Sequence, residues 1–215
     1  MNFFQQSSLF SFSLLSVAIL MFLLPTISAT HHSSNPKSNA TDFIRTSCNV
    51  TLYPDICYNS LSRYANAVKY NSGRLARIAM SVSLAQARDM LTHVSSLSRQ
   101  TNSGGAAAEP KTIAALHDCY ETFDDAVDQM QRSIKEMSHL GTGEKLSFHM
   151  SNVQTWMSAA LTNEETCTDG FDEVLDGPMK LDVCSRATKV KKFTSNGLAL
   201  VNSFVAQQIG VSRSP

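Results

Sequence analysis

The chain carries an apolar stripe whose period fits one face of an α-helix. Between Lys111 and Leu140, apolar residues recur at alternating intervals of three and four residues. They are Ile113, Leu116, Tyr120, Phe123, Val127, Met130, Ile134 and Met137. This alternation follows the roughly 3.6-residue turn of an α-helix and leaves one narrow apolar seam, which is typical of helices packed in bundles. Pro110 lies just ahead of the stripe, where the first turn of a helix tolerates proline.

The same spacing recurs in three other segments. They are Met80, Leu84, Ala87, Leu91 and Val94; then Val153, Trp156, Ala160, Cys167, Phe171 and Val174; then Val190, Phe193, Gly197, Leu200 and Phe204. Breaks at Thr101–Ala108, Gly141–Gly143 and Asp176–Pro178 separate these segments. No comparable alternating apolar run predicts a strand. The pattern predicts an all-α fold, an antiparallel four-helix bundle over residues 71–210.

Ahead of the bundle, residues 41–66 predict a separate helical hairpin. Two short helical stretches flank Pro54, because proline cannot continue the first helix but can start the second. Cys48 and Cys57 lie on either side of the turn. A bridge between them would close the hairpin and stabilise it by about 2–3 kcal/mol. So short a hairpin buries too little apolar surface to hold its shape alone.

The N-terminal region predicts secretion. Residues 1–29 contain no charged residue, and Leu9–Leu24 is dominated by apolar residues and serine. Pro25 breaks the run and the small residue Ala29 follows, which is the layout of a signal peptide over residues 1–29. An uncleaved membrane anchor is the alternative, but a spanning helix needs about 20 apolar residues and this run is shorter. Residues 30–40 are polar and are predicted to be disordered, so the folded domain is expected over 41–210.

Secretion decides how the five cysteines are interpreted. In an oxidising compartment they can form two bridges and leave one thiol, and fifteen such pairings are possible. The sequons at Asn39 and Asn49 are candidate glycosylation sites of an extracellular chain. Eighteen acidic residues balance eighteen basic ones, so net charge indicates neither nucleic acid nor, once the signal is removed, a membrane as partner.

Acidic residues gather in two stretches, which contain twelve of the eighteen. One stripe, spaced three and four apart, is Asp118, Glu121, Asp125 and Asp128; the other is Glu165, Asp169, Asp172 and Asp176, with Glu164 and Glu173 beside it. Like charges at this spacing cost a helix a few tenths of a kcal/mol per pair. A solvated face is the ordinary interpretation of such runs. A surface that binds another molecule is the functional one.

The sequence contains no arrangement typical of catalysis. It lacks the GxSxG nucleophile motif and the HExxH zinc motif, and its histidines are scattered. The paired carboxylates are predicted on convex helix faces, where no pocket would hold a substrate. We therefore expect a protein that is not an enzyme, that uses no cofactor or metal, and that acts by docking onto another protein.

Three segments resemble a known family. They are TSCNVTLYPDIC (residues 46–57), LHDCYETFDDAVDQM (residues 116–130) and VQTWMSAALTNEETCTDGF (residues 153–171). These segments resemble, in order, three blocks of the plant invertase and pectin methylesterase inhibitor family. The third is most similar to the pectin methylesterase branch. The resemblance covers about residues 42–209.

The resemblance implies a four-helix bundle with an N-terminal hairpin, two disulfide bridges and a set of partner-binding residues. It pairs Cys48 with Cys57 and Cys119 with Cys167, and leaves Cys184 as a free thiol, which we expect to act as a small buried apolar residue. In resembling inhibitors the middle helices lie across the enzyme's cleft. The matching positions here are Glu121, Asp125 and Asp128 on one helix and Thr166 and Asp169 on the next.

The expected function is non-covalent, one-to-one inhibition of pectin methylesterase in the apoplast and cell wall, by a protein that is monomeric when free. Its carboxylates would imitate the polyanion that the enzyme's cleft holds. Two alternatives remain. An inhibitor of cell-wall or vacuolar invertase is one, although Glu144–Phe148 lacks the Pro-Lys-Phe triplet typical of that branch. A structural or signalling bundle that inhibits no enzyme is the other.

Overall fold

The computed structural model describes residues 36–103 and 109–212, and within these ranges the chain is helical, without a strand. Its elements are α2 (Pro36–Cys48), α3 (Pro54–Leu61), the 3-10 helix η1 (Ser62–Tyr64), α4 (Ala65–Val68), α5 (Ser72–Ser103), α6 (Pro110–Glu136), α7 (Glu144–Asp169) and α8 (Pro178–Ser212). The predicted signal peptide, residues 30–35 and residues 104–108 lie outside the described residues. None of the described helices is both long and apolar enough to cross a membrane.

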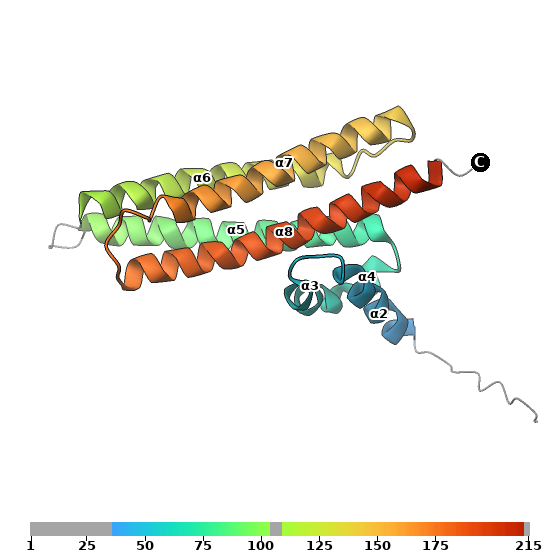
Figure 1. The fold of residues 1–215 in the computed structure, drawn as a ribbon, viewed down its shortest axis with the longest axis horizontal. Coiled ribbons are helices and arrows are strands. Elements are labelled where there is room, and N and C mark those ends of the chain that lie inside the picture. The colour runs from blue at the N-terminus through green and yellow to red at the C-terminus, as the bar shows by residue number, and fades with distance from the viewer. Residues whose placement is uncertain (1–35, 104–108, 213–215) are drawn as a thin grey trace, which may run out of the picture. The chain divides into compact units, whose positions relative to one another are not determined.

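Helices α5 to α8 form an antiparallel four-helix bundle (Figure 1). Each packs against the next along the chain, and α8 closes the ring by packing against α5. The bundle therefore has two layers, one of α5 and α8 and one of α6 and α7. The prediction of an all-α four-helix bundle is confirmed, and the breaks predicted at 141–143 and 176–178 separate its last three helices.

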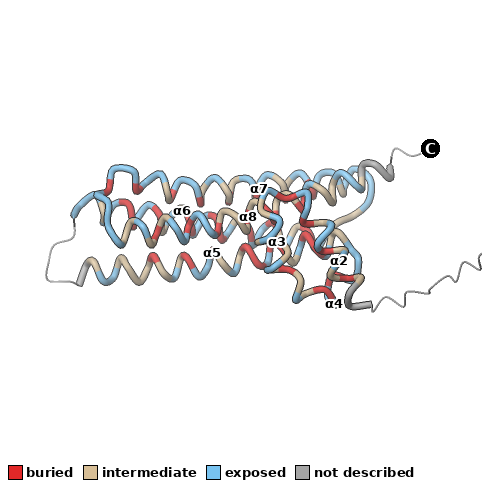
Figure 2. Tube along the Cα trace, turned by 60° about the horizontal axis from the view of Figure 1, so that its bottom comes forward, coloured by how far each residue is buried: buried red, intermediate tan, exposed pale blue. Residues whose placement is uncertain are grey.

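The buried stripe follows the predicted spacing with local shifts (Figure 2). Phe123, Met130 and Met80 are fully buried, whereas Ile113, predicted in the core, is 39% exposed in the first turn of α6. Trp156 is only half-buried, and its neighbour Met157 fills the core instead. Each bundle helix contacts two others, so its buried arc is wider than a single seam. A flexible methionine fits that arc more easily than a large indole.

The third predicted stripe is wrong beyond Cys167, because α7 ends at Asp169. The chain then turns: the backbone N–H of Asp172 bonds to the Asp169 carbonyl three residues back, at 3.0 Å, where an α-helix would use four. Phe171 and Val174 are buried, but they reach the core from this turn rather than from a helix. Lys180 closes the turn by donating from Nζ to the Val174 carbonyl at 2.9 Å.

The predicted disorder of residues 30–40 is wrong for residues 36–40, which form the start of α2. Pro36 suits the first position of a helix, and the buried pair Ala40 and Ile44 lies one turn apart on the inner face. Helices α2, α3 and α4 form the predicted hairpin, which extends past 66 to Val68. It ends where Lys69 adopts a left-handed backbone conformation, with φ of 47°.

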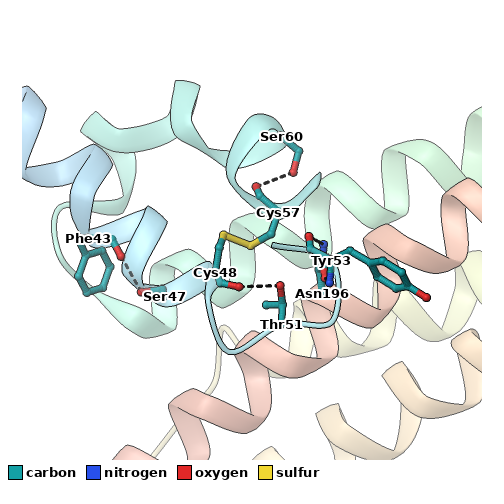
Figure 3. Close-up of a disulfide and its surroundings, with 8 residues drawn as sticks. All are labelled: Phe43, Ser47, Cys48, Thr51, Tyr53, Cys57, Ser60 and Asn196. Atoms are coloured by element: carbon teal, nitrogen blue, oxygen red, sulfur yellow. Dashed lines mark hydrogen bonds between the residues drawn. A yellow bond between two sulfur atoms is a disulfide. The ribbon is translucent and has the colours of Figure 1, made fainter. Parts of the chain in front are cut away.

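A disulfide between Cys48 and Cys57 closes the hairpin, as Figure 3 shows. Both cysteines are 1% exposed, so the bridge forms part of the core. Thr51 is buried inside the turn and donates its hydroxyl to the Cys48 carbonyl at 2.8 Å. The disulfide therefore closes a turn in which the Cys48 carbonyl accepts bonds from both the hydroxyl and the N–H of Thr51.

Asn196 of α8 attaches this turn to the bundle. Its Oδ1 accepts a hydrogen bond from the Tyr53 N–H at 3.1 Å, and its Nδ2 donates to the Tyr53 carbonyl at 2.9 Å (Figure 3). Asn196 is 3% exposed, so these bonds are shielded from water. Its amide bonds to both backbone groups of a residue 143 positions away in the sequence. One buried side chain thus fixes the hairpin against the last helix.

Replacing Asn196 with alanine should therefore destabilise the protein. Asn196→Ala leaves the Tyr53 N–H without its partner, while the Tyr53 carbonyl keeps the bond from the Cys57 N–H at 3.0 Å. We expect the free energy of unfolding to fall by about 1–3 kcal/mol. Denaturant unfolding with both disulfides intact measures it. Asn202→Ala on the same helix, which removes an exposed bond from Gln154, is the control and should cost little. Equal effects of the two changes would contradict this role of Asn196.

Candidate functional site

The centre of the candidate site is the disulfide between Cys119 of α6 and Cys167 of α7, whose Cα atoms lie 4.2 Å apart. This is the pairing that the family resemblance implies. The bridge closes a loop of 48 residues, for which chain entropy gives a stabilisation of about 4 kcal/mol. Near the other end of the pair, Glu136 accepts hydrogen bonds from His149 at 2.8 Å and Asn152 at 2.9 Å. Helices α6 and α7 are therefore joined near both ends, which fixes their relative register.

The predicted carboxylates of α6 lie on its outer surface. Glu121, Asp125 and Asp128 are exposed, whereas Cys119 before them and Phe123 between them are buried. At roughly 100° per residue, the three carboxylates share one face, opposite the core, and span about 10 Å along the axis. Asp128 is paired with Arg132 at 2.5 Å. Glu121 and Asp125 have no ion pair among the described residues.

On α7, Thr166 and Asp169 are exposed on either side of the buried Cys167. The Thr166 hydroxyl donates to the Thr162 carbonyl at 3.0 Å, so it has only acceptor capacity left for a partner. Asp169 occupies the last position of α7, where a negative charge meets the negative end of the helix dipole at a cost of about 0.3–1 kcal/mol. Asp169 therefore does not serve helix stability.

The five predicted partner-binding residues thus lie on the two helices that the bridge joins. We call this set, Glu121, Asp125, Asp128, Thr166 and Asp169, the acidic face.

The second predicted acidic stripe does not exist as a helical stripe, because α7 ends at Asp169. Its remaining members are mostly neutralised by lysines of the same chain. The ion pairs are Glu165 with Lys191 at 2.7 Å, Glu173 with Lys111 at 3.1 Å and Asp176 with Lys180 at 3.1 Å. Glu121, Asp125 and Asp169 are exposed carboxylates to which the described residues supply no cation, and the exposed Asp124 and Asp172 also lack one.

Glu164, predicted to reinforce the acidic stripe, is instead fully buried. Its Oε1 accepts a hydrogen bond from the Thr194 hydroxyl of α8 at 2.7 Å, and its Oε2 has no partner among the described residues. Burial raises the pKa of Glu164 to about 8, against smaller lowering effects of the Thr194 bond and of Lys191. At neutral pH this carboxyl is therefore protonated, and it joins α7 to α8 beneath the acidic face.

The sequence contained a signal for the burial of Glu164. It lies four residues after Ala160 and three before Cys167, which are both buried, so it occupies an apolar position of the helix repeat.

The remaining reactive groups show no catalytic arrangement in the part of the chain that the structure describes. No group of three His, Cys, Asp or Glu there could hold a metal ion. The free thiol of Cys184 is half-buried, and burial raises its pKa, so it stays protonated at neutral pH. Among the candidate glycosylation sites, Asn49 is exposed in the turn after α2 and Asn39 is half-buried within α2.

Comparison with known proteins identifies relatives of the chain. The family described as plant invertase/pectin methylesterase inhibitor matches residues 42–200. Pectinesterase inhibitor 11 of Arabidopsis thaliana is 41% identical over 195 residues, which cover 86% of this chain and 94% of that protein. The 21 kDa protein of Daucus carota is 42% identical over 171 residues, which cover 78% of this chain and 86% of that protein.

A solved structure shows the same fold. It is the crystal structure of mutant form A of a pectin methylesterase inhibitor from Arabidopsis, which matches with a TM-score of 0.58. The match covers 74% of this chain and 95% of that chain at 20% identity.

Glu164 should make the stability of the protein depend on pH. Between its ordinary pKa of 4.5 and its folded value of about 8, the folded chain holds a proton that the unfolded chain has released. Stability therefore falls as the pH rises through this range, by a few kcal/mol at about 1.4 kcal/mol per pKa unit. Glu164→Gln keeps the bond from Thr194 but cannot ionise, so its stability relative to the native chain should grow as the pH rises.

Denaturant unfolding at about pH 5, 6.5 and 8 measures this difference. Glu165→Gln, which changes the exposed neighbour, is the matched control and should leave the pH profile nearly unchanged. A Glu164→Gln protein that loses stability with pH as steeply as the native chain would disprove the assignment.

Proposed function

The chain belongs to the plant invertase/pectin methylesterase inhibitor family, a family of enzyme inhibitors and not of enzymes, and from this premise we propose that it inhibits a plant pectin methylesterase. Two relatives, 41% and 36% identical to this chain, are named pectinesterase inhibitors. We extend that function to this chain as a proposal, which the family match over residues 42–200 and the acidic face support.

The acidic face is proposed to lie over the enzyme's pectin-binding cleft. Such a cleft holds a chain of galacturonic acid units and should contain groups that favour carboxylates. Glu121, Asp125 and Asp169 offer carboxylates that no cation of the described chain neutralises. They can therefore compete for those groups, guided by long-range attraction and held by close packing. Inhibition is one-to-one and reversible, and it requires no covalent step.

The observation that carries this proposal is the bridged pair of helices. Because Cys119 and Cys167 join α6 to α7, the two helices that carry the acidic face are held together before a partner arrives. Binding then costs little conformational entropy, which is the advantage of a preorganised surface. Asp169 at the end of α7 carries its charge at a cost to the helix, which favours a role outside the protein's own stability.

Location and assembly follow the same proposal. A signal peptide over residues 1–29, two disulfides and an extracellular target agree with secretion to the apoplast and cell wall. The free protein is proposed to be a monomer.

The alternative target is an invertase, and the two can be separated by assay. Helix α7 begins at Glu144, in the stretch that lacks the Pro-Lys-Phe triplet of invertase inhibitors. Purified protein titrated against a plant pectin methylesterase and, separately, an acid invertase should stop methyl-ester hydrolysis and leave sucrose cleavage intact. Loss of sucrose cleavage alone would favour the alternative. Loss of neither activity would point to a non-inhibitory bundle.

Charge reversal in the acidic face should separate inhibition from stability. Asp125→Lys/Asp169→Lys places repulsive charges against the enzyme's cleft, and we expect the inhibition constant to rise at least about tenfold. The same change puts a cation at the end of α7, where the helix dipole favours it, so the unfolding free energy should not fall. Steady-state inhibition and denaturant unfolding measure the two effects.

The matched control is Asp42→Lys/Asp89→Lys, which changes charge equally on exposed positions of α2 and α5. It should inhibit like the native chain. If the acidic-face variant kept full potency, or if the control lost as much, competition by the acidic face would be excluded.

A further inference from the structure

Charge is distributed unequally between the two layers of the bundle. Helices α5 and α8 contain nine Lys or Arg and two Asp or Glu. Helices α6 and α7, with the turn at residues 170–177, contain four Lys or Arg and thirteen Asp or Glu. The protein is neutral as a whole, so this separation makes one layer basic and the other acidic. A basic layer attracts anions to a surface that the proposed inhibition does not use.

The basic layer contains a groove along the seam between α5 and α8. Two adjoining cavities, of about 540 and 340 Å³, share Gln86 of α5 and Lys189 of α8. Along α5 the lining residues are Val82, Gln86 and Asp89, and along the antiparallel α8 they are Phe193, Lys189 and Arg186. Both sets are spaced three and four apart, so each helix turns one continuous face to the groove.

The N-terminal hairpin closes one end of this groove. Asn59, Ser60 and Arg63 line the smaller cavity together with Ile56. The hairpin therefore adds amide, hydroxyl and guanidinium groups opposite the side chain of Phe193. Since Asn196 fixes the hairpin to α8, this end of the groove is held in place.

Two cations in the groove have no ion pair among the described residues, namely Arg63 and Lys189. Arg63 is exposed, and the carbon of its guanidinium group lies over the Tyr64 ring, 5.0 Å from the ring centre. Lys189 lies where the two cavities meet. Both side chains are available to an anionic ligand.

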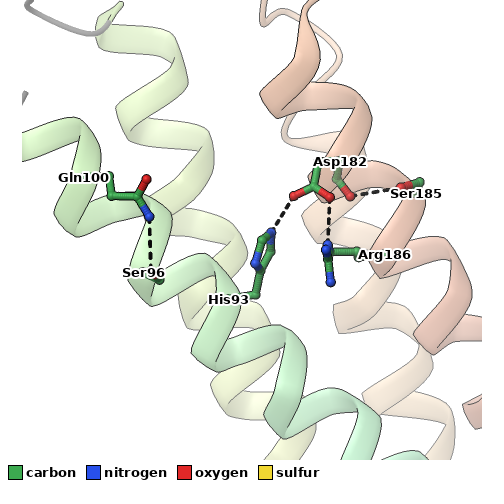
Figure 4. A network of polar contacts seen from close by, with 6 residues as sticks. All are labelled: His93, Ser96, Gln100, Asp182, Ser185 and Arg186. Atoms are coloured by element: carbon green, nitrogen blue, oxygen red, sulfur yellow. Dashed lines mark hydrogen bonds and ion pairs between the residues drawn. The ribbon is translucent and has the colours of Figure 1, made fainter.

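The far end of the groove contains a cation whose position is fixed (Figure 4). Nε of Arg186 donates to Oδ1 of Asp182 at 2.7 Å, and Nε2 of His93 lies 2.5 Å from Oδ2 of the same carboxylate. Asp182 is therefore already engaged on both oxygens, and the bond from Arg186 is the main reason that its pKa is lowered. Asp89 is the other carboxylate that lines these two cavities.

We propose that this α5–α8 groove binds a chain of uronic acid units with free carboxylates, the chemistry of de-esterified pectin. Such a chain carries one carboxylate and several hydroxyls per ring. Arg63, Lys189 and Arg186 would take successive carboxylates, while Asn59, Ser60 and Gln86 would bond hydroxyls. The apolar face of a sugar ring would lie against Phe193, in the usual combination of apolar walls and a few placed polar groups.

The composition of the groove favours a uronate chain over other anions. A polyphosphate or nucleic acid requires a dense series of cations, whereas here cations alternate with amides, hydroxyls and one free carboxylate. A second copy of this chain, docking its acidic face, is the main competing occupant. That second copy would have to fit rigid helices into a seam formed by two small adjoining cavities. An extended polymer fits such a seam more easily.

This inference rests on the proposed function for the source of its ligand, because the proposed target enzyme produces free carboxylates on pectin. The groove and the acidic face belong to opposite layers, so one inhibitor molecule could hold the enzyme and its polymeric product together. The product would then concentrate the inhibitor where de-esterification has already occurred. Binding of the polymer itself requires no enzyme and can be measured alone.

The test is direct binding of purified protein to polygalacturonate oligomers by calorimetry, without enzyme present. The native chain should bind, and fully methyl-esterified oligomers of the same length should not. Arg63→Gln/Lys189→Gln should weaken binding at least about tenfold. The matched control Arg77→Gln/Arg88→Gln removes the same charge from exposed positions of α5 that do not line the groove, and it should change binding less than about threefold.

Three results would overturn the proposal: no binding by the native chain, equal loss in both double variants, or binding of esterified and free oligomers alike. Self-association of the native chain in sedimentation, lost only in Arg63→Gln/Lys189→Gln, would assign the groove to a second copy instead. Failure of the proposed inhibition can be told apart from failure of polymer binding. Asp125→Lys/Asp169→Lys should keep full polygalacturonate binding, and Arg63→Gln/Lys189→Gln should keep full inhibition of the enzyme.

Discussion

The covalent bond between Cys119 and Cys167 is the constraint on which the site depends. Helices packed only through apolar side chains can slide along their common axis with little change in buried area. A disulfide between two cysteines whose Cα atoms lie 4.2 Å apart removes that freedom and sets which turn of α6 lies beside which turn of α7. The carboxylates of one helix and the hydroxyl and carboxylate of the other can therefore form one surface. Beneath it, the neutral carboxyl of Glu164 links the bridged pair to α8.

The two layers of the bundle share one apolar interior but differ in the charge of their outer surfaces. Each layer contributes methionines and small residues to a shared core, so their packing is alike. Their outer surfaces diverge in charge, and the lysines that neutralise Glu165 and Asp176 come from α8 in the basic layer. These exposed pairs add little to the free energy of folding, which the shared apolar core dominates, while the charges far from the boundary stay available to ligands.

Apolar periodicity was sufficient to predict an all-helical fold, because spacings of three and four residues, such as those from Leu116 to Met137, fit one face of an α-helix. It failed where the same periodicity continues past the end of a helix. Phe171 and Val174 keep helical spacing, yet they enter the core from a turn, which spacing cannot distinguish. Charge patterning failed similarly for Glu164, because residue type indicated exposure while position indicated burial. The positions of Glu121 and Thr166 on helices followed from the sequence, but which turn of α7 lies beside which turn of α6 required the bridge that the resemblance supplied.

The amide of Asn196 has a consequence for how the protein is made. It holds the turn at Tyr53, near the beginning of the folded region, to a helix that is synthesised last. The hairpin can form its local disulfide early, but its anchorage has to wait until nearly the whole polypeptide has left the ribosome. Until then the nascent hairpin can pack only against α5, the bundle helix that follows it in the chain. A premature stop before residue 196 would therefore leave the N-terminal hairpin without the side chain that fixes it to α8.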